Sequence, residues 1–487
     1  MKLFIIIYMQ TIMAEDIIRR IRTENSWWEG EHRIRDTPRN MKRRPYFELF
    51  YPLIRQPVRR AVVLMGPRRV GKTVMLHHSI QMMLDDDVRP ATICYFSVDH
   101  PIYNGLRLET LLEYFGQSAG VNYKSEKVYV FFDEIQYLRD WEVHLKSAVD
   151  TYPNIKFIAS GSSAAALRLK SNESGAGRFT DFLLPPLNFY EYLHLLGNTG
   201  LVYQPSGKAL ESGRTHFVTD KIDELNQLFV SYMNFGGYPE LVLSPEMRMD
   251  PGRYIKSDIV DKVLLRDLPS LYGIGDIQEL NHLFTTLAFN TANEISLGEL
   301  SQSAGVAKNT IKRYIEYLEA AFLIKVIHRV DHSAKRFHRA NFFKIYLTNP
   351  SMRAALFSPV KSDDRALGGL TETAVFSQWF HGDITTLHYA RWQDGEVDVV
   401  RLSEETQKPL WAVEVKWSDR YCDHPAELKS LVSFAGANKL KRPWVTSITR
   451  TADREVDGIQ LRFVPASLYC YTVGYNATHR KNEKFQH

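Results

Sequence analysis

The sequence predicts a multidomain α/β protein, with a parallel-sheet domain first, a helical middle part and a second α/β domain at the C-terminal end. Its 487 residues are too many for one ordinary core and suggest about three domains. Short apolar segments alternate with longer helical patterns from about residue 59 to 189, which is typical of a doubly wound sheet. Mainly helical patterns follow to about residue 323, and strand patterns return from about residue 340.

The composition is that of an ordinary globular protein, with 44% hydrophobic and 24% charged residues, which argues against extensive disorder. A net charge of +5 permits a nucleic-acid partner without requiring one. The three cysteines lie far apart without metal-ligand spacing, which favours a reducing compartment. The apolar start lacks a small-residue cleavage site, and Met13 is an alternative first residue. No later segment reaches the ~18 apolar residues of a membrane span, so we expect a cytoplasmic protein without membrane contact.

The expected parallel sheet is built from nearly continuous apolar runs, as strands covered on both faces usually are. They lie at residues 61–65, 92–98, 128–132 and 156–160. Ligands of such sheets bind beyond the carboxyl ends of the strands, so the residues that follow each run are the candidates for a site.

The segment after the first run reads GPRRVGKT and fits the pattern G-x-x-x-x-G-K-[ST] in full. Gly66 and Gly71 let the backbone curl so that its N–H groups point at phosphate oxygens, and the following helix adds its partial positive charge. Lys72 can reach the β and γ phosphates, and Thr73 can ligate Mg²⁺. The sequence therefore predicts a site for ATP and Mg²⁺. The predicted phosphate-binding residues are Gly66, Pro67, Arg68, Arg69, Val70, Gly71, Lys72, Thr73 and Val74.

Acidic and hydroxyl residues follow the later strands. In VYVFFDEIQ, Asp133 can help to hold Mg²⁺, and Glu134 can orient the attacking water as general base. Ser160 ends the fourth run and either senses the γ-phosphate or belongs to a strand-end turn. Arg178, in a glycine-rich segment, is a candidate arginine finger within its own subunit or toward a neighbour in a homo-oligomer, with a plain surface role as the alternative.

The middle of the chain predicts a helix-turn-helix. Apolar residues recur at helical spacing on both sides of Gly305, which marks the turn. Lys308, Lys312 and Arg313 would lie on the exposed start of the second helix, the part that enters the major groove in DNA-binding proteins.

The basic segment 325–344 suits a wing that contacts DNA phosphates. The alternative is a winged helix that packs beside the nucleotide-binding domain and contacts no DNA.

The last third carries a second set of chemical residues. Glu372 lies in a helical pattern and Asp398 in a strand pattern, whereas Glu414 and Lys416 lie two apart on one buried strand and so share a face. This order resembles the PD-(D/E)xK nuclease core. Asp398 and Glu414 would hold Mg²⁺, which lowers the pKa of a bound water. Lys416 would position that water, and Glu372 would complete the metal shell. A nuclease-like fold without cleavage activity is the alternative.

Several motifs taken together resemble those of the archaeal-type AAA-like ATPases of bacteria and archaea. They are, in order, GPRRVGKT, FFDEIQ, SGSS, GRFTDFLLPPLNFYEYL and FGGYPE. The resemblance covers roughly residues 40 to 470. It implies a P-loop ATPase, a winged helix and a restriction-endonuclease-like C-terminal domain, and it says little about cellular role.

The same resemblance implies that ATP binds through Gly66, Lys72, Thr73 and Asp133. One departure stands in KIYLTNPSM. The family usually shows an aspartate followed shortly by Gly-Leu, where this chain has Asn349 and then Ser351-Met352.

These patterns divide the chain into a basic helical arm (1–44), a P-loop ATPase domain (45–197), a helical linker or lid (198–290), a winged helix (291–345), a nuclease-like domain (346–475) and a tail (476–487). We expect an ATP-dependent protein that acts on DNA, with the nuclease-like domain under nucleotide control. The alternative is a nucleotide-driven switch that binds DNA or a partner protein and has an inactive C-terminal domain.

Overall fold

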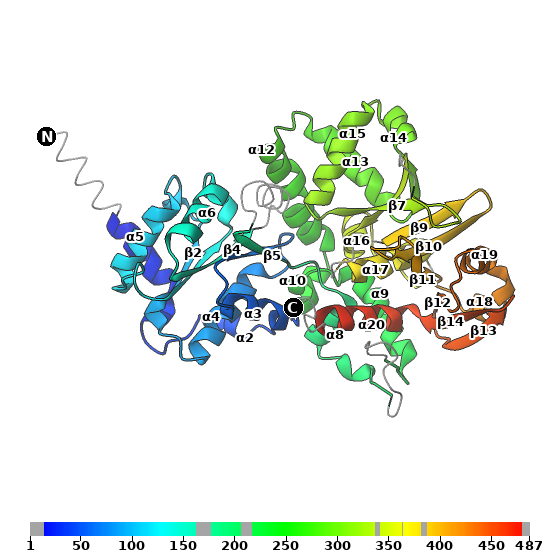
Figure 1. Cartoon of the computed structure of the whole chain (residues 1–487), viewed down its shortest axis with the longest axis horizontal. Helices are drawn as coiled ribbons and strands as arrows, with labels where there is room; N and C mark the ends of the chain where they lie inside the picture. Colours follow the sequence, from blue (N-terminus) through cyan, green and yellow to red (C-terminus); the bar gives the residue numbers. More distant parts are fainter. Residues whose placement is uncertain are drawn as a thin grey trace. The chain divides into compact units, whose positions relative to one another are not determined.

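The computed structural model describes residues 14–161, 177–205, 217–336, 341–362, 364–380 and 387–479 (Figure 1). The chain forms two compact units that meet at the bond between Leu184 and Pro185. Among the described residues, the first unit contains a five-stranded sheet and the second a nine-stranded sheet. The predicted multidomain α/β class is confirmed.

The sheet of the first unit is parallel throughout, in the order β2-β3-β4-β1-β5. Its strands are β1 (Ala61–Met65), β2 (Ile93–Ser97), β3 (Val128–Asp133), β4 (Ile155–Gly161) and β5 (Phe179–Leu183). Four of them lie where the apolar runs predicted them. The fifth, β5, lies in a segment for which we predicted no strand, and it pairs with β1 from Ala61↔Phe179 to Met65↔Leu183.

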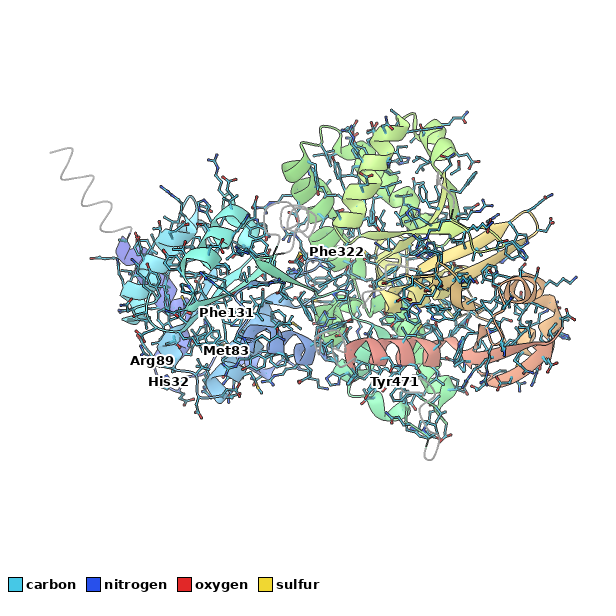
Figure 2. The ribbon with its side chains drawn as sticks, in the orientation of Figure 1. His32, Met83, Arg89, Phe131, Phe322 and Tyr471 are labelled. Carbon is cyan, nitrogen blue, oxygen red and sulfur yellow. The ribbon has the colours of Figure 1, made fainter. Side chains whose placement is uncertain are left out.

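Helices cover both faces of this sheet, which explains why its strands are apolar throughout. They are α2 (Asp36–Asn40), α3 (Phe47–Arg55), α4 (Lys72–Asp85), α5 (Leu108–Ala119) and α6 (Trp141–Thr151). Met83 on α4 and Phe131 on β3, both labelled in Figure 2, are fully buried. Gly120 takes the left-handed conformation that ends α5, with φ of 65°.

The predicted N-terminal arm is part of the first unit's core. Residues 14–24 are helical and bury Ile17 and Ile21. Trp27 and Trp28 each donate an indole hydrogen bond to the Ile93 carbonyl, at 3.1 and 2.8 Å. These tryptophans anchor the arm to the first unit.

Asn25 pairs with the outer edge of β2. Its Nδ2 donates to the Tyr95 carbonyl at 2.9 Å, and its Oδ1 accepts from the Tyr95 N–H at 2.7 Å. One amide side chain thereby satisfies the donor and the acceptor of an edge-strand residue that has no strand partner on that side within the described part of the chain.

The nine-stranded sheet of the second unit is mixed, in the order β13-β14-β12-β11-β10-β9-β7-β8-β6. Its strands are β6 (Glu294–Ser296), β7 (Ile324–Val330), β8 (Phe342–Leu347), β9 (Leu387–Trp392), β10 (Gly395–Leu402), β11 (Pro409–Glu414), β12 (Trp444–Ser447), β13 (Ala452–Val456) and β14 (Ile459–Pro465). The parallel pairing of β7 with β9, from His328↔His388 to Val330↔Ala390, joins the strands of the 291–345 segment to those of the 346–475 segment. These two predicted domains therefore share one sheet.

The helices of the second unit surround this sheet. They are α8 (Phe189–Leu196), α9 (Ile222–Phe235), α10 (Pro239–Leu243), α11 (Pro245–Arg248), α12 (Leu268–Tyr272), α13 (Ile277–Phe289), α14 (Leu297–Ala304), α15 (Lys308–Ala320), α16 (Ser351–Leu356), α17 (Leu367–Trp379), α18 (Arg420–Asp423), α19 (Lys429–Ala437) and α20 (Ala466–His479). Between α11 and α12 the chain forms π-helical turns over Gly252–Asp261 and Val263–Asp267. No helix among the described residues is long and apolar enough to cross a membrane.

Helix α8 belongs to the second unit, so the first unit ends near residue 184 and not at the predicted 197. Asn188 caps α8 in a reciprocal capping box with Glu191. The Asn188 Nδ2 also donates to the Gly474 carbonyl of α20 at 3.2 Å, and the Phe189 N–H donates to Gln378 Oε1 at 2.8 Å. Figure 1 shows α8 beside α20, the red helix near the C-terminus.

The motif FGGYPE packs against the segment where the chain departs from the family pattern. A Cβ on Gly237 would lie 2.5 Å from Asn349 Oδ1 and 2.6 Å from Ser351 Oγ, so no side chain fits there. Asn349 is buried and its Oδ1 accepts the Ser351 N–H at 2.9 Å. The neutral asparagine therefore supplies an acceptor for this turn without burying a charge.

We predict that Asn25→Ala lowers the free energy of unfolding by about 2 kcal/mol, because the Tyr95 backbone groups would lose buried partners. Urea denaturation, followed by amide hydrogen exchange at Tyr95, measures the effect. The matched control is Asn104→Ala, at an exposed asparagine of the same unit. Equal stability losses in the two variants would contradict the edge-pairing role.

Candidate functional site

The segment 66–71 forms a tight loop between β1 and α4. A Cβ on Gly66 would lie 2.1 Å from the Leu184 carbonyl oxygen, so only glycine fits. Gly71 has φ of 95° and turns the chain into α4. Lys72 is 4% exposed, and its Nζ donates to the carbonyls of Gly66 at 3.1 Å and Pro67 at 2.8 Å. The ammonium thus lies against the loop that the sequence assigned to phosphate.

The other loop residues differ in exposure. Val70 is fully buried, Arg69 is exposed with φ of 64°, and Arg68 and Val74 are half-buried. The Val70 carbonyl accepts a hydrogen bond from Arg44 at 2.8 Å. Arg44 was not predictable from the sequence because it is one of many basic residues in the N-terminal segment.

A buried carboxylate lies beside the loop, at the end of β3. Asp133 accepts hydrogen bonds from Thr73 Oγ1 at 2.7 Å and from the Tyr95 hydroxyl at 2.8 Å, both on Oδ2, and from Ser160 Oγ on Oδ1. Burial raises the pKa of Asp133, and the neighbouring Glu134 charge raises it further. The predicted pair of Thr73 and Asp133 is therefore in direct contact.

Ser160, near the end of β4, contacts both acids at the end of the neighbouring strand β3. Its hydroxyl is fully buried, donates to Asp133 and accepts the Glu134 N–H at 3.1 Å. Glu134 has a left-handed backbone with φ of 58°, which is uncommon for a residue other than glycine. The Glu134 Oε2 accepts from Gln136 at 2.5 Å. Ser160 thus holds the geometry of the acids in this structure, and its role as a phosphate sensor stays a prediction. Ser162 lies outside the described residues.

Tyr95 and His77 were missed by sequence reasoning. Tyr95 lies within an apolar run, where an aromatic residue is expected as core, and only its hydroxyl reaches Asp133. The His77 ring lies 4.7 Å from the Tyr95 ring. Burial, together with the charges of Arg35 and His78, lowers the pKa of His77 to about 4, so the imidazole is neutral at pH 7.

The structure does not bring Arg178 to the phosphate loop. Its carbonyl accepts the Ala61 N–H at 2.9 Å, at the start of β1, whereas the loop follows the end of β1. Five strand residues separate these two edges by about 16 Å. Arg178 Nε donates to Asp150 Oδ1 at 2.5 Å. A finger role within its own subunit does not fit this geometry, and a role toward a neighbouring subunit stays a prediction.

The four predicted residues of the last third do lie together. Lys416 Nζ is 2.7 Å from Glu414 Oε1 and 3.9 Å from Asp398 Oδ2. Asp398 Oδ2 also accepts the Val415 N–H at 2.8 Å. Glu372, on α17, faces the same cluster, since its Oε1 lies 2.9 Å from Lys344 Nζ, which is itself 3.8 Å from Asp398 Oδ1.

Three residues that the sequence analysis did not select complete this cluster. Lys344 Nζ lies 2.9 Å from Glu372 Oε1 and 2.6 Å from Glu396 Oε1. The Tyr346 hydroxyl donates to Glu372 Oε1 at 2.6 Å. The K-x-Y spacing on one strand face was the available signal for Lys344 and Tyr346.

The position of Lys344 corrects the predicted basic wing. We assigned this lysine to an exposed phosphate-contacting segment, but it is 3% exposed and lies among carboxylates. Lys325 and Arg329 of the same segment form ion pairs, with Glu319 at 2.6 Å and Glu294 at 3.8 Å. Side chains alternate between the two faces of β7 and β8, so part of the segment points inward. The charge of the segment alone did not reveal this. Residues 337–340 lie outside the described residues.

Glu372 and Glu414 of the second cluster are buried close to other carboxylates, which disfavours their ionised forms. Burial, with a further contribution from the Asp398 charge, raises the pKa of Glu372 to about 7 and that of Glu414 to about 8. Burial alone would lower the pKa of Lys344, but Glu372, Asp398 and Glu396 outweigh it and raise this pKa above its ordinary value. Glu414 Oε2 is buried and has no hydrogen-bond partner among the described residues.

Only two carboxylates of this cluster, Asp398 and Glu414, are suitable ligands for a metal ion. Within the described ranges, no group of three or more His, Cys, Asp or Glu side chains has the arrangement of a metal site. The predicted three-carboxylate shell of Glu372, Asp398 and Glu414 is therefore not formed. Asp398 and Glu414 remain suitable because Mg²⁺ often binds through one or two carboxylates and keeps several waters.

The predicted helix-turn-helix residues lie on the surface. Helices α14 and α15 are joined at Gly305, with φ of 67°. Lys308, Lys312 and Arg313 are all exposed on the first turns of α15. This exposure meets the first requirement of a phosphate-contacting face.

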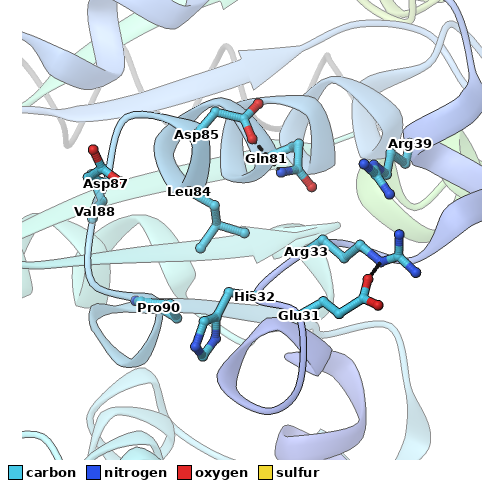
Figure 3. Close-up of a pocket in the computed structure, with 10 residues that line it drawn as sticks. All are labelled: Glu31, His32, Arg33, Arg39, Gln81, Leu84, Asp85, Asp87, Val88 and Pro90. Atoms are coloured by element: carbon cyan, nitrogen blue, oxygen red, sulfur yellow. Dashed lines mark hydrogen bonds and ion pairs between the residues drawn. The ribbon is translucent and has the colours of Figure 1, made fainter.

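A separate polar cavity of about 490 Å³ lies at the other end of α4 (Figure 3). The phosphate loop precedes α4, and the cavity lies about 20 Å away along this helix. It is lined by Glu31, His32, Arg33, Arg39, Gln81, Leu84, Asp85, Asp87, Val88 and Pro90. Within it, Arg33 pairs with Glu31 at 2.7 Å and Gln81 donates to Asp85 at 2.8 Å. It is distinct from the phosphate loop.

Two family models match parts of the chain. An AAA domain matches residues 58–193, and a domain of unknown function (DUF8612) matches residues 226–364. The AAA match and the loop geometry both indicate a phosphate-binding loop in the first unit. Residues 58–193 of this unit are similar to an AAA domain, a class of nucleotide-binding P-loop fold.

The curated relatives carry no activity in their descriptions. An uncharacterized protein of Methanocaldococcus jannaschii is 26% identical over 64% of this chain and 66% of its own length. An uncharacterized protein of Haemophilus influenzae is 23% identical over 60% of this chain and 68% of its own length. The chain thus spans about two thirds of the length of these relatives.

Two solved structures are similar at a coarse level. A Walker-type ATPase of Pyrococcus abyssi matches 64% of this chain and 94% of its own, with 16% identity and a TM-score of 0.35. The ORC2 protein of Aeropyrum pernix, in ADPNP and ADP complexes, matches 72% of this chain and 97% of its own, with 12% identity and a TM-score of 0.37.

We predict that the thermal stability of the protein falls between pH 5 and pH 8 without added metal, and that Glu414→Gln reduces this fall. The pKa of Glu414 rises from 4.5 to about 8 on folding. Its contribution is therefore fully present below pH 4.5 and is lost as the pH rises toward 8. The difference between the proteins should be on the order of 1–3 kcal/mol. Calorimetry across this pH range measures it, with exposed Glu405→Gln as control. Parallel pH profiles of wild type and Glu414→Gln would contradict the assignment.

Proposed function

We propose that the chain binds and hydrolyses ATP in its first unit and acts on DNA through its second unit, with the nuclease-like centre under nucleotide control. The observation that carries the ATPase proposal is the contact of Thr73 with the buried Asp133, at 2.7 Å, beside the buried Lys72. A lysine, a hydroxyl and a carboxylate at the end of one parallel sheet are the groups that phosphoryl transfer needs.

The residues of the loop fit the roles that ATP and Mg²⁺ require. The Lys72 ammonium, which now donates to the carbonyls of Gly66 and Pro67, would donate to β and γ phosphate oxygens. Thr73 and Asp133 would hold Mg²⁺, which neutralises phosphate charge when bound. Glu134 would accept a proton from the attacking water, and Gln136 orients its carboxylate. Arg178 would act only on a neighbouring subunit of a homo-oligomer.

For the second unit we propose a PD-(D/E)xK-like nuclease centre. The buried Glu414 Oε2, without a hydrogen-bond partner among the described residues, supports a cation beside it. Asp398 and Glu414 would hold Mg²⁺, which would supply Lewis-acid chemistry. Lys416 would hold the attacking water and stabilise charge on the phosphodiester.

We further propose that residues 291–345 form a DNA-binding winged helix, with Lys308, Lys312 and Arg313 toward the major groove. Their exposure at the start of α15 supports this proposal. The described cysteines are unpaired and buried, which supports a reducing cytoplasm as the location.

A second candidate function is a nucleotide-driven switch with an inactive C-terminal centre. The ion pairs of Lys344 with Glu372 and Glu396 favour it, because a lysine neutralises carboxylates that a two-cation nuclease would use. DNA or a partner protein would then be bound and not cut.

We predict that Lys72→Ala lowers ATP turnover by about 10²-fold or more, because it removes a donor to the transferred phosphoryl group. Phosphate release by the purified chain with Mg²⁺ measures this. Lys146→Ala, at an exposed lysine of α6, is the control and should retain wild-type turnover. Normal hydrolysis by Lys72→Ala would refute the phosphate-loop assignment.

We predict that the chain cuts DNA in the presence of Mg²⁺ and that Glu414→Ala abolishes the cut, because the cation loses a carboxylate ligand. Linear, supercoiled and single-stranded DNA are incubated with wild type, Glu414→Ala and the exposed-site control Glu405→Ala, each with and without ATP. Loss of cleavage in Lys72→Ala would show control by nucleotide. Absence of cleavage on every substrate, with ATP turnover intact, would favour the switch.

A further inference from the structure

Lys344 lies on the side of the second cluster opposite to Lys416, with Asp398 between them. Lys344 Nζ is 3.8 Å from Asp398 Oδ1, and Lys416 Nζ is 3.9 Å from Asp398 Oδ2. The cluster therefore has two halves. One contains Lys344, Glu372 and Glu396, and the other contains Lys416 and Glu414.

The two halves differ in how completely their oxygens are satisfied. On the Lys344 side, Glu372 Oε1 accepts from both Lys344 and Tyr346, at 2.9 and 2.6 Å. On the other side, Glu414 is 8% exposed, and its Oε2 lacks a hydrogen-bond partner within the described ranges. A buried carboxylate oxygen without a donor is costly, and a bound cation removes that cost.

From this asymmetry we infer that Lys344 acts as a fixed cation on the Glu372 side, so that the centre takes a single divalent cation, held by Asp398 and Glu414. The inference rests on the proposed nuclease function and specifies its metal stoichiometry. Lys344 is a positioning residue in this account. It holds Glu372 Oε1 and Asp398 Oδ1 in place. The metal would then bind on the side of the cluster that contains Glu414.

The same contact makes the middle segment part of the centre. Lys344 lies on β8, between β6 and β7, in register with Glu294 and Ile327. The centre thus depends on a strand from the proposed winged helix as well as on β10 and β11. Removing the Lys344 ammonium should therefore change the affinity for a cation, even though the proposed metal ligands Asp398 and Glu414 are unchanged.

The test is a titration of the full-length protein with Mn²⁺, without nucleotide or DNA, in a Thr73→Ala background that removes a cation ligand from the phosphate loop. Calorimetry or electron paramagnetic resonance gives the number of ions and their affinity. We expect one Mn²⁺ in the second unit, lost in Glu414→Gln. Lys344→Met should bind a second Mn²⁺ or bind the first at least about tenfold tighter, because three carboxylates lose a counter-charge.

Lys344→Arg should retain the stoichiometry of the parent protein, and Lys325→Met, at a half-buried lysine of β7, is the control. Mn²⁺ binding by Lys344→Met that equals the parent's would overturn the inference.

If Lys344→Met does not fold, Glu372→Gln decides, because it changes only the Lys344 side. Mn²⁺ affinity within about twofold of the parent supports the inference, and a loss of tenfold or more, which is about 1.4 kcal/mol of binding free energy, overturns it. Binding of one Mn²⁺ without any DNA cleavage would refute the proposed nuclease and still support the cation assignment.

Discussion

The compensation of buried carboxylates is the constraint on which both candidate sites depend. A carboxylate taken out of water needs donors or a cation around it, and otherwise it becomes protonated. Asp133 meets this need with hydroxyl groups from three different elements. The second cluster meets it with two lysines, and Glu414 is left incompletely satisfied.

This constraint explains why distant parts of the chain converge. Tyr95 and Ser160 come from the strands on either side of Asp133 in the sheet, and Thr73 comes from the start of α4. In the second unit, Lys344 comes from the segment that the sequence assigned to a separate domain. The ion pairs of this lysine and the β7–β9 pairing give the second unit a single continuous sheet.

Local motifs allowed the sequence to predict the phosphate loop, four strands of the first sheet and the grouping of Asp398, Glu414 and Lys416. These features depend on residue spacing along one strand or one turn or, for Asp398, on two strands that follow each other in the chain, β10 and β11. The role of Lys344 was not predictable in this way, because its partners lie 28, 52 and 54 residues away along the chain and are brought close only by strand pairing. Strand β5 was missed because its apolar run is interrupted by Thr180 and Asp181.

The central claim is that ATP turnover at Asp133 and Thr73 is coupled to DNA. Steady-state phosphate release, measured with increasing duplex DNA in wild type and in a Lys312→Ala/Arg313→Ala variant, tests it most directly. We expect DNA to change turnover several-fold in wild type and the variant to need more DNA for the same change. Turnover that is independent of DNA in both proteins would contradict the coupling.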